Sequence, residues 1–135
     1  MVIQLLIAED HPWVREGLRA TFEDTEIEIN NEATTGDEAV QMALTGDADV
    51  MLLDIKMPQR DGFEVLQAVK PKKPALHIVI YTQHERTSFQ DRARQLGASG
   101  YLHKRAAPED LIDAVRRVNR GEDLWISSKG NEYTN

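Results

Sequence analysis

Apolar segments of two kinds alternate along this chain, and their periods predict a regular order of strands and helices. The run at 50–53 is apolar at every position, which predicts a strand covered on both faces. At 26–30, apolar and polar residues alternate, which is typical of an edge strand with one wet face. We predict strands at 2–8, 27–30, 50–53, 78–80 and 100–103, and helices at 12–22, 35–44, 61–70, 85–96 and from 108 onward.

The strict alternation of the two element types predicts an α/β protein of five βα units. Such a chain forms a doubly wound parallel sheet with helices on both faces and right-handed crossovers. The last clear helix is amphipathic, whereas residues 127–135 are polar and have no period. We therefore predict one domain at 1–121 and a linker or tail at 122–135.

Chemically suitable side chains follow the predicted strands at the ends where an open parallel sheet binds its ligands. A carboxylate directly after the apolar run at 50–53 is partly desolvated, so it needs a charged partner. Carboxylates beside one ammonium group predict a cation site that contains a nucleophile, which suits phosphoryl transfer to an aspartate. The residues at these strand ends are Glu9, Asp10, Asp54, Thr82 and Lys104.

Each of these residues also has an ordinary structural explanation. Asp10 precedes Pro12 and is of the type that caps a helix N-terminus. Asp54 can serve as a structural ion-pair partner, and Lys104 as a surface lysine. Glu9 can be a solvated loop charge, and the Thr82 hydroxyl can simply bond the nearby backbone. Their joint occurrence at four strand ends favours a functional site.

Composition narrows the classes of function. The 135 residues carry a net charge of −7, and an acidic surface argues against nucleic-acid binding by this chain. The chain has no cysteine, which excludes disulfides and thiolate metal sites. No apolar stretch approaches the roughly 20 residues that span a bilayer, and the N-terminus enters a strand without a signal peptide. These features predict a cytoplasmic protein with no membrane partner.

Taken together, these motifs closely resemble those of the response-regulator receiver domains of bacterial two-component signalling. The resemblance extends from residue 2 to about residue 120, nearly the whole chain, and the combination of motifs is specific. The matching segments are 7–10, 52–58, 61–62, 82, 97–98 and 101–104.

The resemblance implies a fold, a phosphoacceptor and a cofactor. The fold is the flavodoxin-like (βα)5 sandwich, with a five-stranded parallel sheet in the order 2-1-3-4-5. Asp54 corresponds to the phosphoacceptor, which receives its phosphoryl group from a sensor histidine kinase. Glu9, Asp10 and Asp54, together with the backbone carbonyl of Lys56, correspond to the ligands of Mg²⁺.

The resemblance also implies a switch. Thr82 and Lys104 correspond to the residues that contact the phosphoryl group. Tyr101 corresponds to the aromatic residue that changes rotamer together with Thr82. The predicted helix at 85–96 has only a thin apolar stripe, so we expect it to be weakly anchored and to move when the domain is phosphorylated.

Three further segments, at 10–18, 104–111 and 119–122, resemble the NarL/FixJ-type transcriptional regulators. Regulators of this type carry a helix-turn-helix domain after a linker. We therefore expect DNA to be bound through a domain absent from this chain, and homodimers to form on phosphorylation.

Two other functions are alternatives to this interpretation. A stand-alone receiver would act only through protein–protein contacts. A haloacid-dehalogenase-type phosphatase also uses an aspartate nucleophile and Mg²⁺, but it needs a second acid two residues later, where this chain has Lys56. We therefore predict a signalling module and not an enzyme.

Overall fold

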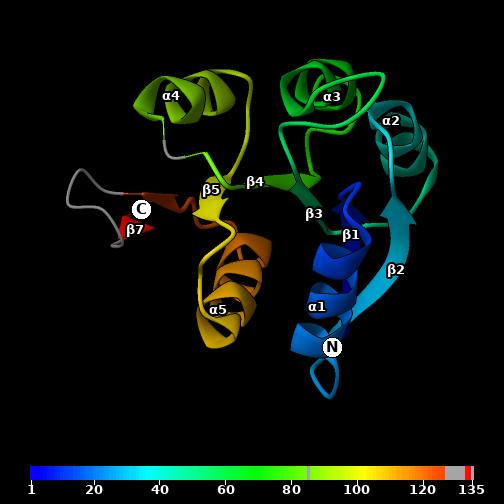
Figure 1. The fold of residues 1–135 in the computed structure, drawn as a ribbon, viewed down its shortest axis with the longest axis vertical. Coiled ribbons are helices and arrows are strands. Elements are labelled where there is room, and N and C mark those ends of the chain that lie inside the picture. Colours follow the sequence, from blue (N-terminus) through cyan, green and yellow to red (C-terminus); the bar gives the residue numbers. More distant parts are fainter. Residues whose placement is uncertain (85, 127–132, 135) are drawn as a thin grey trace.

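The protein folds as one open parallel sheet with helices on both faces, which confirms the predicted α/β class (Figure 1). The computed structural model describes residues 1–84, 86–126 and 133–134. The sheet order is β2-β1-β3-β4-β5, as the resemblance implied. Within the described residues, no helix is long and apolar enough to cross a bilayer. The elements are β1 (Ile3–Ala8), α1 (Pro12–Phe22), β2 (Ile27–Ala33), α2 (Gly36–Thr45), β3 (Val50–Leu53), α3 (Gly62–Val69), β4 (His77–Thr82), α4 (Thr87–Gln95), β5 (Gly100–His103), α5 (Pro108–Asn119), β6 (Trp125–Ile126) and β7 (Tyr133–Thr134).

The helices form two layers, with α2, α3 and α4 on one face of the sheet and α1 and α5 on the other (Figure 1). The central strand β3 contributes to both layers because successive side chains of a strand point to opposite faces. Met51 and Leu53 pack in the core beneath α2, α3 and α4, whereas Val50 and Leu52 pack against the other two helices. This double coverage explains why the run at 50–53 has no polar alternation.

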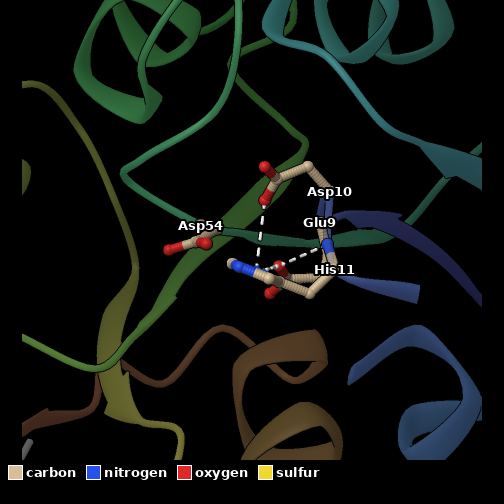
Figure 2. A group of neighbouring side chains, drawn as sticks. All are labelled: Glu9, Asp10, His11 and Asp54. Atoms are coloured by element: carbon tan, nitrogen blue, oxygen red, sulfur yellow. Dashed lines mark hydrogen bonds and ion pairs between the residues drawn. The ribbon is translucent and has the colours of Figure 1, made fainter. Parts of the chain in front are cut away.

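The start of α1 differs from the prediction. The N-cap residue is His11, which makes no side-chain capping hydrogen bond, and Pro12 is the first helical residue. The interpretation of Asp10 as the helix cap is therefore wrong. Asp10 lies one position too early to cap α1, and its carboxylate turns toward Glu9, His11 and Asp54 (Figure 2).

The segment predicted as a linker or tail begins with residues that pack on the domain. Leu124 and Trp125 are buried, and Leu124 forms a parallel bridge with Gly100 at the start of β5. The polar stretch at 127–135 lies outside the described residues except for 133–134, which pair antiparallel with β6. The domain boundary between residues 121 and 122 stays a prediction.

Gly62 packs directly beneath the loop that follows β3, so replacing it should reduce stability. An added Cβ would lie 2.6 Å from the carbonyl oxygen of Asp54 and 2.9 Å from the Cα of Ile55. Because both neighbours are backbone atoms, we expect Gly62→Ala to lower the free energy of unfolding by about 1–3 kcal/mol, measured by urea unfolding. The matched control is Gly17→Ala in α1, where an added Cβ has no neighbour within 4 Å. This substitution should raise the free energy of unfolding by about 0.5–1 kcal/mol. A Gly62→Ala protein as stable as the wild type would contradict the close packing.

Candidate functional site

The site forms where β1 and β3 end side by side. The two strands pair in parallel with Ala8 opposite Leu53, so the next residues along each chain, Glu9 and Asp54, emerge together. The backbone N–H of Asp54 donates to the carbonyl of Ala8 at 3.0 Å, which extends the pairing to the site. Figure 2 shows the resulting group of Glu9, Asp10, His11 and Asp54. The sequence predicted three of these four residues.

Asp54 is held in one orientation and is only 5% exposed. Its Oδ1 accepts the backbone N–H of Ile55 at 2.8 Å, and its Oδ2 accepts the Lys104 ammonium at 2.9 Å. Burial raises the pKa of Asp54 above its ordinary value and outweighs the opposing effect of Lys104, while the nearby charge of Glu9 adds to the rise. The result is an oriented, partly desolvated carboxylate.

Lys104 forms ion pairs with two carboxylates. Its Nζ lies 2.6 Å from Glu9 Oε1 and 2.9 Å from Asp54 Oδ2. Burial lowers the pKa of Lys104, but the bonds to Glu9 and Asp54 outweigh it and raise the pKa overall. Burial likewise opposes ionisation of Glu9, which is 1% exposed, yet the bonds from Lys104 and His11 bring its pKa below the ordinary value. One ammonium group therefore faces two negative charges.

His11 belongs to the site, and sequence reasoning missed it. Its Nδ1 lies 2.9 Å from Glu9 Oε2 and 3.3 Å from Asp10 Oδ1, between the two carboxylates (Figure 2). The backbone N–H of His11 donates to the same Glu9 oxygen at 3.1 Å. The available signal was its position directly after Glu9 and Asp10, at the turn where α1 begins.

The cluster fits a hard divalent cation. One ligand atom from each of Glu9, Asp10, His11 and Asp54 lies within 4.8 Å of the others. Among the described residues, the buried oxygens Glu9 Oε1 and Asp10 Oδ1 face only the ion-pair partners Lys104, at 2.6 Å, and His11, at 3.3 Å. Mg²⁺ prefers oxygen ligands and needs few of them from a protein, because it retains several waters. The donor set is therefore suitable for Mg²⁺.

The two predicted switch residues are both linked to His84, in the loop between β4 and α4. Thr82 ends β4 and is fully buried, and its Oγ1 accepts the backbone N–H of His84 at 3.3 Å. Tyr101 in β5 is also buried, and its hydroxyl donates to the His84 carbonyl. Lys104 reaches the same strand end, since its backbone N–H donates to the Thr82 carbonyl at 2.9 Å. The predicted ligand Lys56 lies in the loop after Asp54 with its side chain exposed.

This fold and this strand-end cluster are those of a signalling receiver domain, and comparison with known proteins agrees. Residues 5–116 match the family of response regulator receiver domains, so the chain belongs to that family. Within it, the chain is of the NarL/FixJ type. It is the receiver domain of a two-component response regulator, as the sequence predicted.

The similar proteins are response regulators, and the curated ones are longer than this chain. The response regulator UvrY of Escherichia coli is 34% identical over 90% of this chain and 56% of its own length. The nitrate/nitrite response regulator protein NarP of the same organism is 34% identical over 96% of this chain and 60% of its own length. A two-component response regulator of the LuxR family from Aurantimonas superimposes with a TM-score of 0.87 at 28% identity, covering 96% of this chain and 92% of that structure. The chain thus spans somewhat over half the length of these curated relatives.

Proposed function

We propose that this receiver accepts a phosphoryl group on Asp54 from a sensor histidine kinase. The single observation that carries the proposal is the state of Asp54, which is buried, oriented by Ile55 and paired with Lys104. A carboxylate oxygen of Asp54 attacks the phosphorus atom, the bond from phosphorus to the donor nitrogen breaks, and the histidine imidazole leaves. Lys104 then pairs with a phosphoryl oxygen in place of its bond to Asp54.

The proposed cofactor is Mg²⁺, held by Glu9, Asp10 and Asp54 with the backbone carbonyl of Lys56. When bound, Mg²⁺ neutralises negative charge on the carboxylates and on the phosphoryl oxygens. The gathering of one ligand atom from each of Glu9, Asp10, His11 and Asp54 within 4.8 Å of the others supports this assignment. In this role the chain's own residues orient the acceptor and compensate its charge.

We further propose that phosphorylation changes the surface formed by α4, β5 and α5, through Thr82 and Tyr101. The Thr82 hydroxyl turns to the phosphoryl group and leaves the N–H of His84, to which it is bonded at 3.3 Å. The output is transcriptional, through a DNA-binding domain outside this chain and with homodimers formed on phosphorylation. The similarity to YxjL of Bacillus subtilis, which is named a transcriptional regulatory protein, and to RcsB, whose dimers were solved bound to DNA, supports this part of the proposal.

Labelling with a small phosphodonor in the presence of Mg²⁺ tests the proposal. We expect stable incorporation approaching one phosphoryl group per chain. Rapid release of phosphate would instead favour the phosphatase alternative, which the exposed Lys56 two residues after Asp54 already disfavours. No incorporation would favour an interaction domain that works without phosphorylation.

Removing the Asp10 carboxylate should weaken Mg²⁺ binding. The ring of Trp13 lies 4.9 Å from that of His11, which contacts Asp10, so its fluorescence should report the ion. We expect Mg²⁺ to alter Trp13 emission in the wild type and not in Asp10→Ala, with affinity reduced at least about tenfold. Asp47→Ala is the control. Asp47 is exposed and precedes the first residue of β3, whereas the site lies at the other end of this strand. An unchanged Mg²⁺ affinity in Asp10→Ala would contradict the proposed ligand set.

A further inference from the structure

The chain after α5 forms a parallel bridge with the open edge of β5. The N–H of Leu124 donates to the carbonyl of Ser99, and the N–H of Tyr101 donates to the carbonyl of Leu124, both at 2.9 Å. Leu124 packs in the core with α1 and α5, while Trp125 packs in the core with α2, α3 and α4. The two side chains thus alternate across the sheet as in a strand, and the bridge at Leu124 covers part of the edge of β5.

Local features direct the chain onto this edge. Gly121, with φ of +96°, turns the chain at the end of α5, and Glu122 is held by Arg117 at 2.9 Å and by Arg120 at 3.1 Å. Gly100 permits the close approach, because an added Cβ there would lie 2.8 Å from the carbonyl oxygen of Leu124. Residues 122–126, here called the exit segment, therefore occupy a defined docking position.

The exit segment is joined to the phosphorylation site by consecutive contacts. Thr82 Oγ1 accepts the N–H of His84, and the His84 carbonyl accepts the hydroxyl of Tyr101. The backbone N–H of Tyr101 in turn holds the exit segment at Leu124. A second link comes from α4, since the guanidinium of Arg94 lies 4.5 Å from the ring centroid of Trp125 and covers it.

We propose that the exit segment is a conformational coupling element whose docking on β5 depends on the phosphorylation state of Asp54. This inference rests on the proposed phosphoacceptor function. When Thr82 turns to the phosphoryl group, the His84 loop and α4 shift, and the cover over Trp125 loosens. The change then passes directly to the chain beyond residue 126, without requiring a partner to detect the altered helix face.

Trp125 provides the test, because the chain has two tryptophans and Trp13→Phe leaves Trp125 as the sole reporter. Trp125 is 5% exposed, so acrylamide should quench it weakly in the resting state. With Mg²⁺ and beryllofluoride as the phosphoryl mimic, we expect its quenching constant to rise at least twofold. The same protein carrying Asp54→Asn should show no rise. A constant that stays the same or falls on binding of the mimic overturns the coupling.

Binding of the mimic is followed separately by the ¹⁹F resonances of bound fluoride. If these resonances do not appear, the phosphoacceptor function itself fails, and the coupling fails with it. If they appear while Trp125 does not respond, only the coupling is overturned.

Reciprocity supplies a second measurement, since two linked equilibria bias each other equally. Weakening the docking of the exit segment on β5 should favour the activated state of the receiver. Trp125→Ala is therefore expected to bind beryllofluoride at least threefold more tightly than the wild type does. Arg94→Gln, which keeps the tryptophan but removes its cover, should act in the same direction and serves if Trp125→Ala does not fold. Asp123→Ala, an exposed neighbour, is the control and should leave the affinity unchanged. Equal affinities in the wild type and both variants would overturn the proposal.

Discussion

Asp54→Asn is expected to abolish labelling by a phosphodonor such as acetyl phosphate, with incorporation reduced at least about a thousandfold. Asparagine has nearly the same shape as aspartate, but its amide is a poor nucleophile and carries no charge. The fold should survive, because the amide oxygen can still accept the N–H of Ile55, bonded at 2.8 Å in the wild type. Intact-mass spectrometry measures the incorporated phosphoryl group, and circular dichroism confirms folding.

Asp61→Asn is the matched control for this variant. The Asp61 side chain caps α3 by accepting the N–H of Glu64 at 2.9 Å, and asparagine is an equally good capping residue. Labelling of the Asp61→Asn protein should therefore equal that of the wild type. Full labelling of Asp54→Asn would show that another residue accepts the phosphoryl group.

Lys104→Met is expected to lower the free energy of unfolding by about 3–5 kcal/mol at neutral pH in the absence of divalent cations. Methionine keeps the length of the side chain but removes the ammonium that pairs with both Glu9 and Asp54. Two buried carboxylates then lack a counter-charge, which is more costly than losing an exposed ion pair. Chemical denaturation in buffers without metal measures the loss.

The loss of stability in Lys104→Met should depend on pH in a direction that can be predicted. Without the ammonium, burial raises the pKa values of both carboxyl groups in the folded state above their values in the unfolded chain. A group with a raised folded-state pKa stabilises the fold at low pH, and that stability is lost as the pH rises through the folded-state pKa. The difference from the wild type should therefore shrink on acidification.

Two further measurements distinguish the loss of counter-charge in Lys104→Met from a simple loss of packing. Mg²⁺ should restore part of the stability of Lys104→Met, because a bound cation replaces the missing positive charge. Asp54→Asn introduced into Lys104→Met should also restore part of it, by removing one of the two uncompensated charges. A large loss that neither addition reduces would contradict the electrostatic explanation.

The order of elements was predictable because hydrophobic periodicity is a local property of the chain. The apolar run at 50–53 coincides with β3, and the amphipathic pattern from Pro108 coincides with α5. The packing of Leu124 and Trp125 in the exit segment was not predicted. Leu124 and Trp125 are too few to show a period, and their burial depends on the open edge of β5 and on Gly100, which is distant in sequence.

The candidate site was predictable as a set of residue types but not as a set of contacts. The ends of the apolar runs placed Glu9, Asp10, Asp54 and Lys104 at one edge of the sheet, since parallel strands end on the same side. The role of Asp10 as a cap was wrong, and His11 was missed, because both depend on the exact residue at which α1 begins.

The sequence by itself determined the α/β class, the succession of strands and helices, and the acidic and basic residues at the strand ends. Each of these follows from the spacing of residues a few positions apart. Only the tertiary structure decided that Lys104 pairs with Glu9 and Asp54 together, that His11 lies between two carboxylates, and that Trp125 packs beneath Arg94. These contacts depend on strand register and on how the helices pack, which bring Lys104 to Glu9 and Asp54, 95 and 50 positions away in the sequence.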